Sequence, residues 1–361
     1  MCNYIAYWRE YPDMFIDFLQ TGEDGQIPET GLRFYFYQRC FLRIAMRYRY
    51  VYAVFPRAYS KSFLSVLVLM CRCILYPRAK LFVTAGGKEQ AASIVKEKVD
   101  ELCTLVPALD RELDRRLGKT REGKDYVMYM FKNKSWFDNI AAAEKSRGKR
   151  RHGGLIEECV GVDEKMLQEI IVPIMNISRK CMDGSTHNEE ILNKSQIYIT
   201  TAGYKNTYPY NKLIQTLVQM ITEPDKAFVM GGTFKIPVIA GLLDKDFIID
   251  LRRDGTFNEV SFLREYESKW AGTSEDAFFS GDAFDRNRVL QKPEYEHSGR
   301  SSAQSYYILA MDVARKNTGK DGCDSVITVL KVTPQNYGEV SIKSLVNIYS
   351  LTNMHFEDQA I

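Results

Sequence analysis

Histidine and closely paired cysteines are scarce in this chain of 361 residues. It contains four histidines and eight cysteines, and no two cysteines have the Cys-x-x-Cys spacing. Structural zinc sites usually combine such pairs with closely spaced histidines, so this class of site is not expected. Scattered cysteines without a disulfide framework favour a reducing compartment.

Long apolar runs and a strong charge of one sign are also missing. The longest apolar run, residues 63–76, contains Arg72 and is shorter than the roughly 20 residues that cross a bilayer. The first residues lack the charged stretch and the apolar stretch of a secretory signal, so we expect no membrane partner. A net charge of +3 does not by itself indicate a nucleic-acid partner, and the basic clusters at residues 111–121 and 147–151 could be solvated surface.

What the chain does contain is an alternation of strand and helix patterns. Predicted strands cover residues 48–55, 81–84, 126–131, 136–142, 154–157 and 197–200. Predicted helices cover residues 33–47, 62–76, 88–105 and 163–178, after a helical arm that ends near residue 31. This alternation predicts an α/β fold with a mostly parallel sheet, helices on both of its faces, and functional loops at the carboxyl ends of its strands.

The pattern changes after residue 237. Residues 240–300 have the composition of a small helical linker subdomain, and residues 296–305 are rich in serine, glycine and charge. Residues 306–313, 325–332 and 339–349 then indicate three strands with short connections, which is typical of an antiparallel meander. We therefore expect one domain at residues 1–300 and the start of another at residues 301–361.

Residues 55–62 (FPRAYSKS) have the pattern of a phosphate-binding loop without its glycines. Such a loop surrounds a triphosphate with backbone N–H groups at a helix N-terminus, with a lysine on the phosphates and a hydroxyl on magnesium. Lys61 and Ser62 follow a predicted strand and open an apolar helix, but Phe55 and Ser60 replace the usual glycines. The alternative is a surface Lys-Ser dipeptide, of which the chain has four more.

An acidic pair, Glu157-Glu158, ends another predicted strand. In a phosphate-transfer site one carboxylate would hold magnesium, and the next would orient and deprotonate the attacking water. The alternative is the acidic start of a helix.

In their order along the chain, these motifs are similar to those of the large terminase subunit of tailed bacteriophages, a motor that packages double-stranded DNA. The similarity begins near Arg33 and covers most of the chain after it. The matched segments are an adenine-reading motif, a variant P-loop, an Arg-Gly element, a coupling motif, a linker and the opening of a nuclease: residues 37–39, 56–62, 146–148, 199–203, 262–266 and 306–314, the last followed by Asp321 and Asp324.

This resemblance implies a P-loop NTPase fold of the RecA or ASCE type, followed by the start of an RNase H-like α/β domain. It implies ATP and Mg²⁺ as cofactors, with Mg²⁺ or Mn²⁺ at the nuclease site. The residues that would contact the nucleotide or its magnesium are Gln38, Arg57, Ser60, Lys61, Ser62, Glu157, Thr200 and Thr201. The catalytic residues would be Lys61, Glu158 as the base, Arg57 or Arg147 to offset transition-state charge, and Asp312, which with Asp324 would bind the nuclease metals.

Several alternatives stay open. Gln38 could be an ordinary helix surface residue, and Asp312 could have a structural role at the end of a strand. The chain could also be a P-loop DNA helicase, or a P-loop scaffold that does not hydrolyse ATP.

The resemblance also implies partners and a location. The partners would be double-stranded DNA, the portal protein, the small terminase subunit and further copies of the chain in a ring, a pentamer on the portal. The location would be the host bacterial cytoplasm and, transiently, the portal vertex of the prohead. Three departures from the family pattern are Ser60 for glycine, Glu157 for aspartate, and a nuclease segment that stops before the remaining acids of the family's cleavage site.

Overall fold

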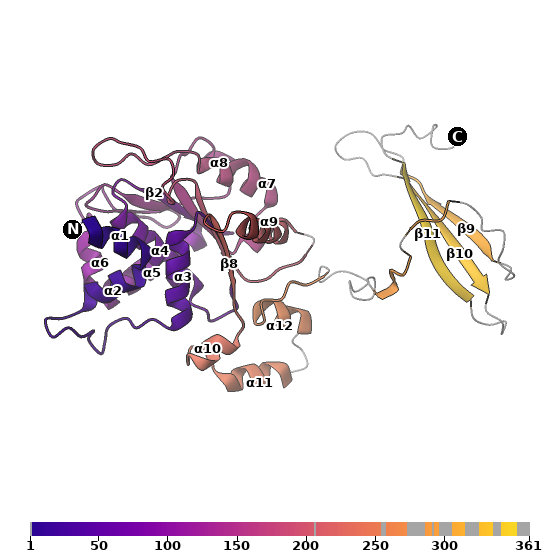
Figure 1. Ribbon diagram of the computed structural model, residues 1–361, viewed down its shortest axis with the longest axis horizontal. Helices are drawn as coiled ribbons and strands as arrows, with labels where there is room; N and C mark the ends of the chain where they lie inside the picture. The colour runs from indigo at the N-terminus through magenta and orange to yellow at the C-terminus, as the bar shows by residue number, and fades with distance from the viewer. Residues whose placement is uncertain are drawn as a thin grey trace. The chain divides into compact units, whose positions relative to one another are not determined.

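The computed structural model describes residues 2–205, 207–253, 258–272, 286–290, 292–295, 305–314, 325–334 and 341–351. The chain divides into two compact units, Met1–Ala277 and Phe278–Ile361. The first unit is built around an eight-stranded sheet, and the second around a three-stranded sheet (Figure 1). The predicted domain boundary near residue 300 lies outside the described residues.

The large sheet is mostly parallel, as predicted. Its strand order is β3-β4-β5-β2-β6-β7-β1-β8, and all neighbouring strands from β5 to β8 pair in parallel. Only the edge formed by β3 and β4 is antiparallel. The bounds are β1 (Tyr50–Val54), β2 (Lys80–Thr84), β3 (Arg121–Glu122), β4 (Val127–Met130), β5 (Trp136–Asn139), β6 (Gly153–Glu157), β7 (Ser195–Thr200) and β8 (Ala227–Gly231).

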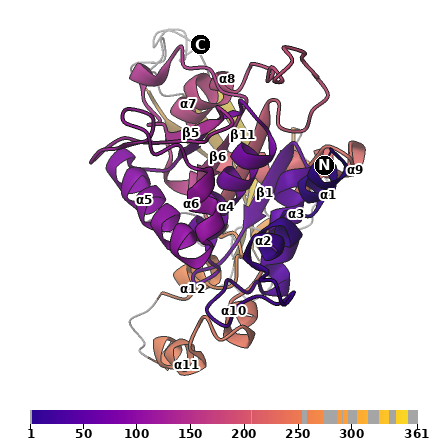
Figure 2. The same cartoon turned by 90° about the vertical axis from the view of Figure 1, so that its left-hand side faces the viewer.

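Helices cover both faces of this sheet, because its strands are apolar on both sides. In β1, Val51 and Ala53 contribute to one core, whereas Tyr52 and Val54 contribute to the other. The first core is covered by α1 (Cys2–Glu10), α2 (Pro12–Gln20), α3 (Phe36–Arg47), α4 (Lys61–Leu75), α5 (Lys88–Leu105) and α6 (Pro107–Glu112). The second is covered by α7 (Glu164–Met166), α8 (Val172–Ile174) and α9 (Tyr208–Thr222). Figure 2 shows α3, α4 and α5 side by side over the first face.

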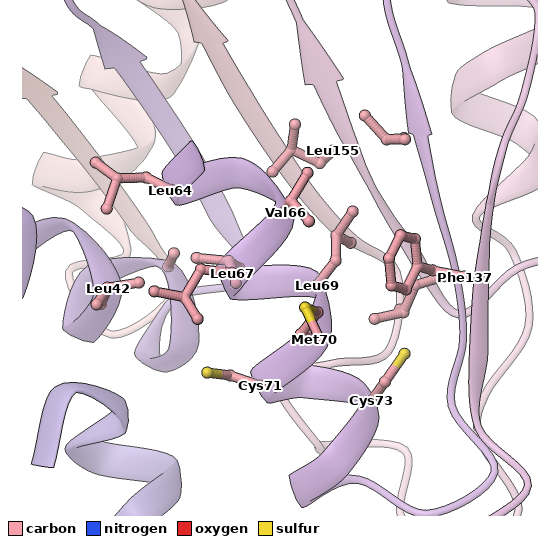
Figure 3. Close-up of a cluster of buried hydrophobic side chains, with 14 of the residues drawn as sticks. Leu42, Leu64, Val66, Leu67, Leu69, Met70, Cys71, Cys73, Phe137 and Leu155 are labelled. Carbon is pink, nitrogen blue, oxygen red and sulfur yellow. The ribbon is translucent and has the colours of Figure 1, made fainter. Parts of the chain in front are cut away.

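Helix α4 is the most deeply buried of these elements, as the apolar run 63–76 predicts. Its side chains pack between Leu42 of α3 and the strand residues Phe137 and Leu155 (Figure 3). Arg72 is 2% exposed and donates hydrogen bonds to Ser195 Oγ and to the carbonyl of Ala45. Burial lowers the pKa of Arg72 to about 10, but its hydrogen bonds join α4 to β7 and α3.

The predicted helix at residues 163–178 is wrong in its length and regularity. The segment consists of α7, a π-helical turn at Leu167–Ile171, and α8. Pro173 has no N–H to donate to the carbonyl of Glu169, so a regular helix cannot continue through it. Instead, the N–H of Val172 bonds to the carbonyl of Leu167, five residues earlier.

Three short helices follow β8. They are α10 (Lys235–Ile239), α11 (Lys245–Arg253) and α12 (Glu259–Glu265), and they share a small core of Ile248, Phe262 and Tyr266. None of the helices in the described part of the chain combines the length and the apolar character needed to cross a bilayer.

The second unit contains β9 (Tyr306–Asp312), β10 (Ser325–Pro334) and β11 (Ser341–Leu351). They pair antiparallel in the order β11-β10-β9, so the predicted meander is confirmed. Glu294 supports it by accepting hydrogen bonds from Lys331 at 3.0 Å and from the hydroxyl of Tyr307 at 3.1 Å.

Candidate nucleotide-binding site

Three predicted functional segments meet at one edge of the large sheet. Strand β7 lies between β1 and β6, so the loop after β1 lies near the carboxyl ends of β6 and β7. The N–H of Phe55 donates to the carbonyl of Thr200, and the N–H of Glu158 donates to the carbonyl of Ile199, both at 2.9 Å. The structure therefore brings together Lys61, Glu157 and Thr200, as the strand-end argument predicts.

The loop at residues 55–62 is held by aromatic packing in place of glycines. Phe55 and Tyr59 are fully buried, and their ring centroids lie 4.4 Å apart, with Tyr37 at 4.2 Å on the other side of Tyr59. Ala58 and Ser60 have φ angles of 59° and 55°. This left-handed conformation costs a residue with a Cβ roughly 1–2 kcal/mol, so the packing of Tyr59 must stabilise it.

Tyr59 in turn requires a glycine elsewhere. A Cβ placed on Gly232, just after β8, would lie 2.2 Å from the Tyr59 hydroxyl. Within the described residues this hydroxyl has no hydrogen-bond partner, and burial raises the pKa of Tyr59.

Lys61 and Ser62 at the N-terminus of α4 contact the acidic pair. Ser62 Oγ donates a short hydrogen bond to Glu157 Oε1, and Lys61 Nζ lies 3.2 Å from Glu158 Oε1. Lys61 Nζ also donates to the carbonyl of Pro56 at 3.3 Å. The described residues provide no hydrogen-bond acceptor for the backbone N–H groups of Lys61 and Ser62, which are among the free N–H groups of a helix start. Such groups suit an anion.

Glu157 is the buried member of the acidic pair. Burial raises the pKa of Glu157, the hydrogen bond from Ser62 opposes this, and the charge of Glu158 adds to it. A carboxylate and a hydroxyl in contact are oxygen ligands of the kind that Mg²⁺ prefers. The described residues contain no group of three acidic, histidine or cysteine side chains that could bind a metal alone, which suits an ion whose other ligands are phosphates and water.

Glu158 is held by the end of β7. Its Oε2 accepts hydrogen bonds from Thr200 Oγ1 at 3.3 Å, from Thr201 Oγ1 at 3.3 Å and from the Thr201 N–H at 3.2 Å. The structure thus places Thr200 and Thr201, expected near the nucleotide, directly against the carboxylate that is expected to be the base.

A pocket of about 360 Å³ extends from Lys61 and Ser62. Gln38 lines it, but the amide of Gln38 is already engaged: Oε1 accepts from the N–H of Tyr35 at 3.0 Å, and Nε2 is 3.4 Å from Ser60 Oγ. Sequence patterns did not indicate Lys98 and Glu101 of α5 or Leu242, which also line the pocket. The only available signal was the helical spacing of Lys98 and Glu101, which any amphipathic helix has.

The two candidate arginines are both paired with carboxylates of their own chain. Arg57 Nε donates to Glu265 Oε2 at 2.8 Å, next to α12. Arg147 binds Glu144 and, at 3.3 Å, Glu169.

The basic clusters are largely paired as well. In the cluster at residues 147–151, Arg151 is buried and donates to both carboxylate oxygens of Asp138, at 3.2 and 2.7 Å. In the cluster at residues 111–121, Arg115 binds Asp110 and Arg116 binds Asp114.

One segment, residues 265–271, contacts three strand ends. The N–H of Arg57 donates to the carbonyl of Glu265 at 2.9 Å, and the N–H of Phe234 donates to the carbonyl of Tyr266 at 2.8 Å. The N–H of Ala271 donates to the carbonyl of Gly203 at 3.0 Å. The segment therefore joins the loops that follow β1, β7 and β8.

In the second unit, Asp312 is the last residue of β9 and is paired in register with Val326 of β10. Asp321 and Asp324, the other acids expected at a nuclease site, lie outside the described residues.

Comparison with solved structures shows the kind of fold. The large terminase of bacteriophage HK97 aligns with 95% of this chain and 68% of its own, with a TM-score of 0.53 and 12% identity. The chain has the fold of a bacteriophage large terminase. Weaker similarities, with 13% identity each, are to the large terminase of a thermophilic bacteriophage in complex with ADP (88% of this chain, 69% of that one, TM-score 0.47) and to the ATPase domain of the Thermus phage P74-26 large terminase (62%, 89%, 0.44).

The terminase fold agrees with the resemblance given by the sequence motifs. The sequence itself matches no family profile and no curated protein. At 12% identity the likeness concerns the fold, so the chemistry must be argued from the site.

Proposed function

We propose that this chain hydrolyses ATP and is the motor subunit that moves double-stranded viral DNA into a prohead. The observation that carries the proposal is the contact of Lys61 and Ser62 with Glu158 and Glu157 across the sheet edge. These residues are about a hundred positions apart in sequence, and together they form the phosphate-binding and acidic halves of one site. The terminase fold supports the choice of motor.

The hydrolysis step follows from these contacts. Lys61 Nζ would leave Glu158 for the phosphates, because they carry more negative charge than one carboxylate. Glu158 would then be free to accept a proton from the attacking water, still oriented by Thr200 and Thr201. Ser62 and Glu157 would hold magnesium, which supplies charge neutralisation at the phosphates. Gln38 and Ser60 would line the nucleotide, and Arg57 or Arg147 would offset charge in the transition state.

Two substitutions test the ATPase proposal. Lys61→Ala should weaken ATP binding, because it removes a positive charge from the phosphates. Glu158→Gln should retain binding but lower turnover by about a hundredfold or more, the usual effect of losing a general base. Binding and steady-state hydrolysis should be measured with Lys343→Ala as a control, since Lys343 also precedes a serine but lies exposed on β11. Hydrolysis by Glu158→Gln at the parental rate would contradict the assignment, and no turnover by the parent would favour the non-hydrolysing scaffold.

The finer parts of the proposal concern partners and the second unit. The motor would act as a ring, a pentamer on the portal protein, with the small terminase subunit as a further partner, in the host cytoplasm and then at the portal vertex. The second unit would be the start of an RNase H-like nuclease, in which Asp312 and Asp324 bind Mg²⁺ or Mn²⁺. The antiparallel meander and the place of Asp312 at a strand end support this assignment.

A further inference from the structure

A second polar pocket lies at the opposite edge of the large sheet. It has a volume of about 600 Å³, and its lining includes Arg78, Lys80, His152, Asn176, Ser178 and Lys180. Lys80 is the first residue of β2, and His152 directly precedes β6. Strands β2 and β6 are parallel and five residues long, so this edge is about 17 Å from the edge that carries Glu157. The two pockets are therefore separate.

The lining of this pocket has an excess of positive charge. It contains Arg78, Lys80 and Lys180 and no carboxylate. Arg78 donates one hydrogen bond to the carbonyl of Cys181 at 3.1 Å, and neither lysine forms an ion pair with a described residue. The neighbouring Arg179, in contrast, is buried and paired with Glu190. The three lining cations are thus available to a ligand.

His152 adds a directional donor to these charges. Its side chain is 4% exposed, lines the pocket, and accepts a hydrogen bond at Nδ1 from the N–H of Lys80 at 2.9 Å. Burial lowers the pKa of His152 to about 4, helped by the charges of Lys80, Arg179 and Arg151. The ring is therefore neutral at pH 7, and its proton is on Nε2. No described residue accepts a hydrogen bond from this Nε2–H, and a nearly buried donor without a partner is costly.

We propose that this pocket is a second anion site, which binds a phosphate group through the Nε2–H of His152 and the cations of Arg78, Lys80 and Lys180. The phosphate belongs either to a free small phosphate or to a nucleic-acid backbone. Both sources offer the acceptor oxygens and negative charge that this lining matches. The proposal is independent of ATP hydrolysis, since it uses no residue of the nucleotide site.

The test removes the pocket's charge in a chain whose phosphate loop is also disabled. Lys61→Ala serves as the background, so that pyrophosphate does not bind at the N-terminus of α4. On it, the triple variant Arg78→Gln, Lys80→Gln, Lys180→Gln is compared with a control of equal charge loss, Lys119→Gln, Lys124→Gln, Lys343→Gln, whose lysines are exposed elsewhere. Calorimetry measures pyrophosphate binding, and fluorescence anisotropy measures binding of a labelled DNA duplex at several salt concentrations. Thermal unfolding confirms that all variants are folded.

We expect the triple variant to bind pyrophosphate at least about tenfold more weakly than the control. If duplex affinity also falls, and the slope of log affinity against log salt drops by roughly 0.9 for each lost contact, the ligand is a nucleic-acid backbone. If only pyrophosphate binding falls, the ligand is a free phosphate. If the triple variant and the control bind both ligands equally, the proposal is overturned. Because the background already lacks Lys61, a failure of the ATPase proposal would not change any of these outcomes.

Discussion

At the scale of single residues, the charged groups of the nucleotide site neutralise one another. Lys61 lies against Glu158, and Ser62 donates to Glu157. Both contacts must rearrange when phosphates and magnesium bind, so the site stores favourable interactions that a ligand has to replace. The more buried carboxylate, Glu157, also affects the stability of the protein.

Replacing Glu157 by glutamine should stabilise the chain at neutral and alkaline pH. The pKa of Glu157 is raised in the folded protein, so as pH increases above about 4.5 the unfolded chain releases this proton first, which favours unfolding. The penalty is complete once pH exceeds the folded pKa. Urea unfolding across pH 4–8 should therefore show Glu157→Gln gaining stability over the parent as pH rises. The exposed control Glu189→Gln should show no such trend, and a flat difference for Glu157→Gln would contradict the argument.

The residue types of the site could be predicted from sequence, but several of their contacts could not. Lys61, Ser62, Glu157 and Glu158 were identified from their places at strand ends. The engagement of the Gln38 amide with Tyr35 and Ser60 depends on how the N-terminus of α3 meets a loop more than twenty residues away. Only the folded backbone fixes such a contact.

At the scale of elements, the phosphate loop is supported by the core. Tyr59 packs between Phe55 and Tyr37 and holds the left-handed residues on either side of it. The loop's shape therefore depends on side-chain volume at positions outside the loop.

Gly232→Ala should disturb the loop without touching it in sequence. The new methyl group would overlap the Tyr59 ring and hydroxyl, and overpacking of this kind costs about 1–3 kcal/mol. Nucleotide affinity should fall with stability, because a displaced Tyr59 no longer holds Ala58 and Ser60.

A double-mutant cycle with Tyr59→Leu provides the check, measured by unfolding free energy and ATP affinity. The smaller side chain should relieve part of the overlap, so the two changes should be non-additive. Additive effects would show that the methyl group acts elsewhere.

The strand and helix predictions succeeded where an apolar run was bounded by clear signals. Helices α4 and α5 and the central strands have such bounds, and the structure confirms them. The prediction failed at residues 163–178, where Pro173 lies inside an apolar, helix-like pattern. No prediction covered β8 or α9, whose sequences contain no motif.

At the scale of the whole molecule, the terminase fold makes assembly a central question. Arg147 is exposed and paired with Glu144 and Glu169, so it is accessible to a neighbouring copy. The structure of one chain does not require it at that chain's own site.

Mixing variants separates Arg147 from Arg57 as the transition-state arginine. If Arg147 serves the site of a neighbour, mixed rings of Arg147→Ala and Glu158→Gln chains should recover part of the ATPase activity. Some interfaces then combine an intact Glu158 with an intact incoming Arg147. Activity should be measured with light scattering to verify assembly. No recovery in assembled rings would assign the role to Arg57.

The segment at residues 265–271 has a consequence for how the molecule opens. Its backbone hydrogen bonds reach Arg57, Gly203 and Phe234, which belong to the loops after three different strands. Local unfolding of this segment therefore breaks all three connections in one event. The amide hydrogens of Arg57, Phe234 and Ala271 belong to a single cooperative unit, and the protection of one from solvent exchange reports on the other two.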